Sequence, residues 1–321
     1  MQAIKNNRTK IIILIGIVII SAIFYQFYGV KTEYFSYAMS IRTPKLIVML
    51  VTAFCIGSAS VIFQSIIQNT IVTPCLLGMN SLYILIHTLI VFVLGSTSFL
   101  VRNKTLSFTI DLIVMGIASV IIYGYLFKKT KGNVLYILLA GTVMATFFSS
   151  VTSTLQRIMD PNEYDTLQNA LLASFHKVNS SIIVFSIVLI ALIFFLLRKE
   201  LSLLNVLTLG KNHAINLGIN YDRSVRRLLL AVTLLIAIAT AMVGPISFLG
   251  LIIANLARQL FKTYSHSYLI LGSTLIGMVV LLIGQSLIEQ VFNFSVNISV
   301  FINVGGGIYF LYLLLRNRGN V

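Results

Sequence analysis

The stretch LILGSTLIGMVVLLIGQSLI, residues 269–288, is twenty residues long and contains no Asp, Glu, Lys or Arg. A helix needs about 20 mainly apolar residues to cross the roughly 30 Å hydrocarbon core of a membrane. This stretch therefore predicts a membrane-spanning helix. Similar apolar runs recur along the chain from residue 11 to residue 315.

The composition of the whole chain supports the same conclusion. Of the 321 residues, 58% are hydrophobic and only 10% are charged. Most of the chain therefore cannot be the surface of a soluble protein, and a soluble enzyme is excluded. Because no segment between the apolar runs is long enough to fold separately, we expect one polytopic membrane domain over residues 1–321.

Ten apolar runs predict an all-α integral membrane protein with about ten transmembrane helices. The predicted helices are 11–28, 45–65, 76–94, 108–127, 135–155, 181–197, 228–242, 248–260, 269–288 and 298–315. The run 248–260 is short for a span, so it is predicted to be tilted or partly re-entrant, with irregular backbone buried in protein or facing water. The first run lacks a small-x-small cleavage site, so it is expected to be a retained helix.

The basic residues predict how the chain lies in the membrane. If the N-terminus is cytoplasmic and the loops alternate, sixteen of the 23 Lys and Arg residues fall inside and seven outside. Cytoplasmic loops carry an excess of Lys and Arg, so both termini are expected in the cytoplasm of a cell-membrane protein. The inside set is Lys5, Arg8, Lys10, Lys128, Lys129, Lys131, Arg198, Lys199, Lys211, Arg223, Arg226, Arg227, Arg258, Lys262, Arg316 and Arg318, and the outside set is Lys31, Arg42, Lys45, Arg102, Lys104, Arg157 and Lys177. This pattern accounts for the net charge of +15 without a nucleic-acid partner.

The longest cytoplasmic stretch, about residues 198–227, predicts a contact surface. Glycines at Gly210 and Gly218 separate two short helical segments, with Ala214 and Leu217 expected on one face. An exposed apolar face needs a cover. A protein partner is one candidate, and membrane lipid attracted by the nearby basic residues is the other.

Several motifs, in order, resemble a known family. The first half reads Arg42-Thr43-Pro44-Lys45, Gly57-Ser58-Ala59, Gln64, Gln68-Asn69, Pro74 and Leu77-Gly78, and the second half reads Leu204-Asn205-Val206-Leu207-Thr208-Leu209-Gly210, Leu217-Gly218, Arg226-Arg227, Gly244-Pro245-Ile246-Ser247-Phe248-Leu249-Gly250-Leu251, Gly305-Gly306 and Phe310-Leu311-Tyr312-Leu313-Leu314. Over about 270 residues this series resembles the FecCD family, the permeases of ABC importers for iron–siderophore complexes and cobalamin.

The resemblance implies a type II ABC importer permease that moves an iron(III)–siderophore complex into the cytoplasm. It implies three kinds of protein partner: two cytoplasmic ATP-hydrolysing subunits, a second permease subunit and an external siderophore-binding protein. The chain has no Gly-x-x-x-x-Gly-Lys-Ser/Thr motif, so ATP is expected on the partner subunits. The histidines are scattered and no metal-ligand spacing occurs, so we expect no catalytic, cofactor or metal site on this chain.

Three sets of residues are expected to carry this function. The coupling surface for the ATP-hydrolysing subunits comprises Leu209, Gly210, Ala214, Leu217, Gly218, Arg226 and Arg227. Family positions place binding-protein docking at Arg42, Lys45 and Glu289. The translocation pathway or gate comprises Gln64, Gln68, Asn69, Gly244, Pro245, Gly250, Asn255, Arg258 and Gln285, although interhelical hydrogen bonding is an alternative role for the polar ones. Gly244-Pro245 breaks the seventh predicted helix, so a packed turn is expected there.

Departures from the family pattern favour a partner permease of different sequence. They are Ala254-Asn255 in place of Pro-His, Gln285 and Glu289 in place of Asp and Arg, Gly307 in place of Pro, and Lys211 in place of Glu. The reversed charge at Glu289 would repel an acidic docking surface. A second, non-identical permease is therefore expected to present the basic residue.

Other interpretations remain open. An ion-coupled secondary transporter would carry buried acidic residues near the midplane, and only Asp111 comes close, at a helix end where a solvated or capped residue is expected. Asp160, Glu163 and Asp165 are expected to form an exposed acidic loop. A membrane scaffold would leave the matched cytoplasmic stretch unexplained, and cobalamin or heme could replace the siderophore within the same family.

Overall fold

Each of the ten predicted apolar runs corresponds to a helix in the computed structural model, which describes residues 2–30, 32–99, 103–129, 133–175, 180–293 and 295–318. The elements are α1 (Gln2–Phe27), η1 (Thr32–Tyr34), α2 (Phe35–Ile67), η2 (Pro74–Leu77), α3 (Met79–Leu94), α5 (Lys104–Lys129), α6 (Val134–Ile158), α7 (Pro161–Leu171), α8 (Ser180–Leu196), α9 (Arg198–Leu207), α10 (Lys211–Asn216), α11 (Tyr221–Val243), α12 (Leu249–Phe261), α13 (His266–Gln290) and α14 (Ile298–Arg318). Four basic residues of the predicted orientation pattern, Lys31, Arg102, Lys131 and Lys177, lie outside the described residues.

Not every apolar helix is long enough to cross a membrane alone. Among the described residues, six helices are long and apolar enough to cross a membrane. Helices α8 and α9, which are bent by 58° relative to each other, form a seventh span if they are taken together. The helices α3, α12 and α14 contribute shorter apolar segments. With 13 residues, α12 is about 20 Å long, which agrees with the prediction that this run is too short for a simple span.

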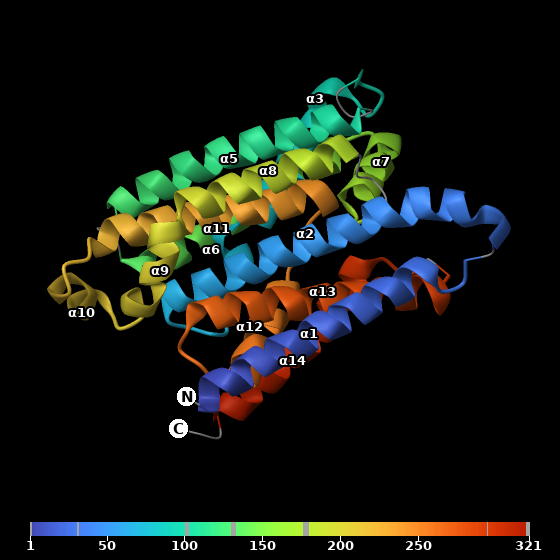
Figure 1. Ribbon diagram of the computed structural model, residues 1–321. Helices are drawn as coiled ribbons and strands as arrows, with labels where there is room; N and C mark the ends of the chain where they lie inside the picture. The colour runs from blue at the N-terminus through green and yellow to red at the C-terminus, as the bar shows by residue number, and fades with distance from the viewer. Residues whose placement is uncertain are drawn as a thin grey trace.

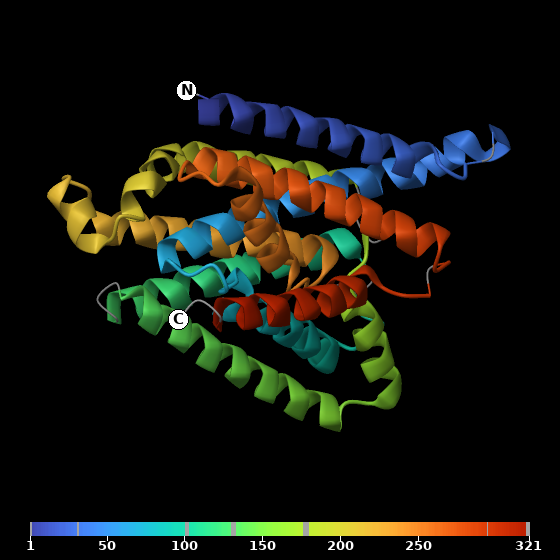
Figure 2. The same ribbon diagram turned by 90° about the horizontal axis from the view of Figure 1, so that it is seen from below.

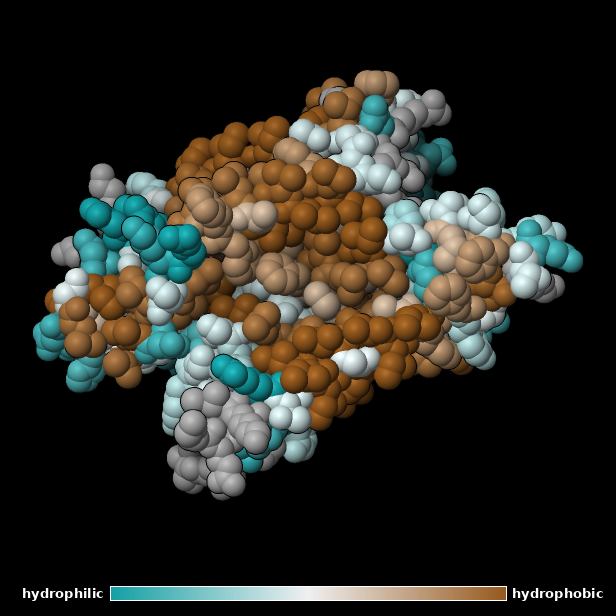
Figure 3. Space-filling model, in the orientation of Figure 1, coloured by the Kyte–Doolittle hydropathy of each residue, from teal (hydrophilic) through white to brown (hydrophobic). Residues whose placement is uncertain are grey.

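The helices form a bundle with an apolar belt. Figures 1 and 2 show α10, the N-terminal end of α1 and the C-terminal end of α14 at one end of the bundle. A continuous brown band crosses the middle of the face in Figure 3, with teal surface toward both ends. An exposed apolar surface this large is typical of a protein embedded in lipid. The chain is therefore a nearly all-helical membrane protein.

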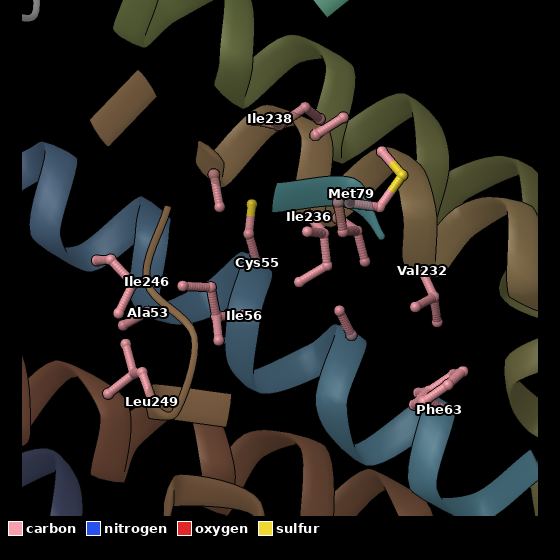
Figure 4. Close-up of a cluster of buried hydrophobic side chains, with 14 of the residues drawn as sticks. Ala53, Cys55, Ile56, Phe63, Met79, Val232, Ile236, Ile238, Ile246 and Leu249 are labelled. Carbon is pink, nitrogen blue, oxygen red and sulfur yellow. The ribbon is translucent and has the colours of Figure 1, made fainter. Parts of the chain in front are cut away.

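Helix α2 lies at the centre of the bundle. In their most apolar windows, α2 and α11 are each 72% buried, whereas α1 is only 11% buried and lies on the periphery. Figure 4 shows the packing of Ala53 and Ile56 of α2 near Ile236 of α11 and Leu249 of α12. Because α2 is covered by α11, α12 and α13, its polar residues can find hydrogen-bond partners only inside the protein.

A glycine permits the closest approach of α2 to α13. A Cβ atom added at Gly57 would lie 3.0 Å from the backbone nitrogen of Thr274 and 3.1 Å from its Cα. These neighbours belong to helix backbone and cannot rotate away. The spacing between α2 and α13 therefore depends on the absence of a side chain at residue 57.

Two local predictions are wrong. The acidic segment forms helix α7, because the Asp160 side chain accepts a hydrogen bond from the backbone of Asn162 and Pro161 occupies the first turn. Helix α2 begins at Phe35, ten residues before the predicted start, and continues through Pro44. Proline is tolerated in membrane helices because neighbouring groups can satisfy the freed carbonyl.

We expect Gly57→Ala to destabilise the protein by about 1–3 kcal/mol, because α2 and α13 must separate to admit the methyl group. The matched control is Gly124→Ala in α5, where an added Cβ meets nothing within 4 Å. Replacing a solvent- or lipid-facing helical glycine by alanine increases the stability of the protein by about 0.5–1 kcal/mol. Thermal unfolding of the two purified variants should shift in opposite directions, and a rise for Gly57→Ala would contradict the packing described.

Candidate functional site

Polar side chains from four helices meet at the C-terminal end of α2. We call this group the polar joint, and it comprises Gln64 and Ser65 of α2, Thr70 after it, Asn205 of α9, Asn255 and Arg258 of α12, and His266 of α13. Gln64, Ser65, Asn255 and His266 are all buried. Three of the predicted pathway residues, Gln64, Asn255 and Arg258, are therefore brought together.

Arg258 is the cation of the polar joint. Its Nε donates a hydrogen bond to Gln64 Oε1 at 3.3 Å, and its Nη2 donates to Ser65 Oγ at 3.1 Å. Gln64 Nε2 and Asn255 Nδ2 both donate to the Thr70 carbonyl, at 2.8 and 2.9 Å. These contacts connect α12 to the end of α2 through neutral oxygens.

His266 extends the polar joint to α9. Its Nδ1 lies 2.6 Å from Asn205 Oδ1, and its Nε2 lies 2.9 Å from Ser65 Oγ. Because an amide oxygen only accepts, we assign the proton to Nδ1, so Nε2 accepts from the Ser65 hydroxyl. The result is a directed chain in which Arg258 donates to Ser65, Ser65 to His266, and His266 to Asn205.

The turn that follows α2 is held by Gln68 and Asn69. Gln68 adopts φ +56°, a left-handed conformation that is disfavoured for a non-glycine residue, and its amide donates to the Thr208 carbonyl at 3.2 Å. Asn69 Oδ1 accepts from the Ile71 backbone at 2.9 Å. Both predicted pathway residues therefore shape the turn, and Gln68 adds a second link to the segment after α9.

The expected packed turn at Gly244-Pro245 is confirmed. Helix α11 ends at Val243, whose carbonyl accepts from the Ser174 backbone at 2.8 Å. Gly244 has φ +100°, and a Cβ there would lie 3.0 Å from Ala173 Cα. A few residues later, an added Cβ at Gly250 would lie 2.1 Å from Ser60 Oγ, so this glycine brings α12 against α2.

Two of the three predicted docking residues, Lys45 and Glu289, face each other inside the chain. Lys45 Nζ lies 3.7 Å from Glu289 Oε1, and their side chains are only 8% and 6% exposed. Tyr25 and Gln285 also donate hydrogen bonds to Glu289 Oε1, at 3.2 and 2.9 Å. We call these residues, with Arg42, the buried ion-pair cluster.

Arg42 completes the buried ion-pair cluster by capping α1. Its Nη1 donates to the carbonyls of Tyr25, Gln26 and Tyr28 at 3.0, 3.1 and 2.8 Å. The prediction that Lys45 and Glu289 face an external protein is therefore wrong, because Lys45 neutralises the reversed charge within the chain. The reversed charge at Glu289 therefore no longer supports a partner permease of different sequence. Gln285 lies about 28 Å along α13 from His266 and is not part of the polar joint.

The predicted coupling stretch forms two short helices joined by glycine turns. Gly210 and Gly218 have φ values of +103° and +79°, and nothing lies within 4 Å of an added Cβ, so their conformation and not crowding requires glycine. Leu209 and Leu217 are 58% and 64% exposed. Ala214 is fully buried, so the prediction that it shares an exposed face with Leu217 is wrong.

Two ion pairs hold this coupling stretch. Arg227 pairs with Glu200 of α9, and Lys211 Nζ lies 3.0 Å from Asp222 Oδ1. Arg226 and Arg227 are both exposed, and Arg227 is engaged within the chain by its ion pair with Glu200. The pairs connect α9 and α10 to the beginning of α11, so the exposed leucines are presented from an anchored segment.

Sequence reasoning missed Ser65, Asn205 and His266 of the polar joint. Asn205 lies in the family motif that ends at Gly210, and its place in that motif could have identified it. His266 was one of several scattered histidines, and only the packing of α13 against α2 and α9 shows its role. Asp111 was also misjudged: it is 2% exposed, and its Oδ1 lies 3.3 Å from His87 Nδ1.

Comparison with known proteins agrees with this architecture. The family model of the FecCD transport family matches residues 9–316. Petrobactin import system permease protein YclO of Bacillus subtilis (strain 168) is 40% identical over 313 residues, which are 98% of this chain and 99% of the relative. Petrobactin import system permease protein FatC of Bacillus anthracis is 35% identical over 280 residues, 86% of this chain and 78% of the relative.

A solved structure shares the fold. It is assigned to the metal-chelate type of ABC transporter in an inward-facing conformation, and it superposes with a TM-score of 0.81 at 22% sequence identity. The match covers 96% of this chain and 99% of that chain. The helix arrangement is therefore that of a known ABC transporter fold.

Lys45→Met should destabilise the protein by about 3–5 kcal/mol, because Glu289 would be left buried without its cation. Adding Glu289→Gln should restore most of the loss, since the amide oxygen still accepts from Tyr25 and Gln285. Lys199→Met, at an exposed lysine, is the matched control and should stay within about 0.5 kcal/mol of the wild type. Unchanged thermal unfolding of Lys45→Met, together with loss of binding-protein association, would instead identify a docking residue.

Proposed function

This chain belongs to the FecCD transport family, and from that membership we propose that it is the permease subunit of an ABC importer for an iron(III)–siderophore complex. The observation that carries the proposal is the match over nearly the whole chain to a petrobactin import permease at 40% identity. Petrobactin, a siderophore, is accordingly the first cargo to test. Cobalamin or heme is the alternative cargo within the family.

We propose that the chain crosses the cell membrane ten times as a single domain of the type II importer fold, with both termini in the cytoplasm. The excess of basic residues on one set of loops supports this orientation. Helix α10 lies at the same end of the bundle as the N-terminal end of α1 and the C-terminal end of α14, which is consistent with this orientation (Figures 1 and 2). In this topology the short helices α3, α12 and α14 complete the ten crossings.

The partners would divide the work of transport. Of the two ATP-hydrolysing subunits, one would dock on this chain at α9 and α10, where Leu209, Ile215 and Leu217 are exposed, and the other on the second permease. ATP would bind to those subunits and not to this chain, which is not itself an enzyme. A second permease would complete the pathway, and an external protein would deliver the chelate. Mass identification of the copurified permease would decide whether it is a second copy or a different chain.

The polar joint would transmit movement from the docked subunit to the pathway helices. A displacement of α10 moves α9 through the anchored coupling stretch, and Asn205 then pulls on His266. From His266, Ser65 and Arg258 carry the displacement to α2 and α12. Because each of these four side chains is hydrogen-bonded, and Ser65 and His266 are buried, the helices would move together and not slip past one another.

An ion-coupled transporter is the second candidate, and one observation favours it. Asp111 is a buried carboxylate in α5, which is the feature expected of an ion-coupled carrier. Against it stands the membership in a family of ABC permeases. The source of energy for uptake distinguishes the two candidates directly.

Leu217→Asp should reduce the amount of ATP-hydrolysing subunit recovered with this chain by at least about tenfold, because a charge replaces an exposed apolar contact. The chain itself should keep its thermal stability, since Leu217 is 64% exposed. Tyr37→Asp, at a residue that is 69% exposed near the start of α2, is the control and should leave recovery unchanged. Normal recovery with Leu217→Asp would place the docking surface elsewhere.

Uptake of radiolabelled iron bound to petrobactin tests the proposed function. Cells lacking this chain should lose uptake, and the wild-type gene should restore it. Uptake should fail when ATP is depleted and continue when an uncoupler removes the proton gradient. Excess unlabelled ferric petrobactin should compete, while cobalamin and heme should not.

Uptake that continues when ATP is depleted and fails when an uncoupler is added would reject the ABC importer and support the ion-coupled carrier. Loss of cobalamin or heme uptake in cells lacking the chain, with uptake of ferric petrobactin kept, would keep the ABC importer and change its cargo. Normal uptake in cells lacking the chain would show that its cargo is not a petrobactin complex.

A further inference from the structure

A second polar region lies between α3, α5, α7 and the end of α11. It is a cavity of about 350 Å³ that none of the residues of the polar joint lines. Asp111 of α5 and His87 of α3 line it, together with Ser107 of α5 and Thr166 and Asn169 of α7. The proposed transport steps do not use these residues.

Asp111 has an unusual environment for a carboxylate. It is 2% exposed, and its Oδ1 accepts no hydrogen bond from the described residues. His87 Nδ1 lies 3.3 Å from that oxygen, and the His87 ring packs on Tyr83 with centroids 4.4 Å apart. A buried carboxylate requires a compensating positive charge, a proton or several hydrogen-bond donors.

The electrostatics of the cavity favour a positive charge. Among the described lining residues there is no Lys or Arg, and the titratable groups are Asp111, His87 and Tyr83. Residues 241–244 at the end of α11 form part of the wall. The C-terminal end of a helix carries a partial negative charge, so it reinforces the carboxylate.

The chemistry of the lining selects the kind of cation. A carboxylate, the hydroxyls of Ser107 and Thr166 and the amide oxygen of Asn169 are hard oxygen donors, which suit alkali-metal ions better than transition metals. A single carboxylate balances one charge. The volume is enough for several water molecules at about 30 Å³ each, so an ion could keep part of its hydration.

We propose that this cavity binds one hydrated monovalent cation, with the Asp111 carboxylate as its counter-charge. The ion would connect α7 to α3, α5 and the end of α11, beside the turn at Gly244. This site is independent of the proposed siderophore transport and would act on the stability of this half of the bundle.

Thermal unfolding of the full chain, purified with its partner subunits, tests the proposal. Sodium chloride and potassium chloride are each titrated against N-methylglucamine chloride at constant ionic strength and neutral pH. We expect a rise of a few degrees in the unfolding midpoint with one of the metal ions, because a ligand bound only to the folded state stabilises it. Hydrogen exchange of α7 should slow in parallel.

Two variants and a control locate the effect. Asp111→Asn should abolish the ion dependence, and Ser107→Ala should shift its midpoint to a several-fold higher concentration while keeping the charge. Asp165→Asn, an exposed position on α7 outside the cavity lining, should behave like the wild type. If Asp111→Asn does not fold, the change in the ion concentration required by Ser107→Ala tests the proposal on its own.

Three outcomes would overturn the proposal. The first is a wild-type midpoint that depends on neither ion, and the second is an ion dependence that Ser107→Ala and Asp111→Asn both leave intact. The third is a midpoint that follows pH but not the metal ions, which would show that Asp111 is compensated by a proton.

Discussion

The hydrogen bonds around Arg258 are the constraint on which the rest of the structure depends. A guanidinium within a helix bundle must be satisfied by its neighbours, and here Gln64 and Ser65 accept from it. Those residues lie on the last turns of α2, which shares with α11 the highest burial among the long apolar helices described. The position of Arg258 therefore fixes α12 against α2, and Ser65 extends the constraint through His266 to α9.

Helix α13 connects this polar joint to the opposite end of the bundle. His266 lies in its first turn, and Gln285 and Glu289 lie in its last two turns, where Lys45 of α2 provides the balancing charge. Between these two polar ends, α13 touches α2 at Gly57, where no side chain keeps the backbones apart. The same two helices are thus joined by an ion pair at one end, by the hydrogen bond between Ser65 and His266 at the other, and by close packing in the middle. Helix α13 is continuous between these two ends.

The sequence predicted local features better than long-range partners. The glycine turns at Gly210 and Gly218 were predicted because each of these glycines follows a short helical pattern in a polar segment, where glycine commonly ends a helix. The burial of Ala214 was not, because a helix of six residues does not reveal which side faces its own chain. The pairing of Lys45 with Glu289 could not be predicted either, since a charge reversal looks like an intermolecular signal until the folded chain places both residues together. Helix α7 was predictable, because Asp160-Pro161 followed by Glu163 is a helix start that was interpreted by its charge alone.

The ratio of cargo imported to ATP hydrolysed in the reconstituted importer tests the central claim, that the polar joint carries movement from α9 to α2 and α12. His266→Leu is the informative variant, because His266 is 5% exposed and cannot touch a partner subunit. Leucine fills most of the space but removes both side-chain hydrogen bonds. The predicted result is assembly and ATP hydrolysis close to the wild type, with import per ATP reduced several-fold. An unchanged ratio in a correctly assembled complex would contradict the account.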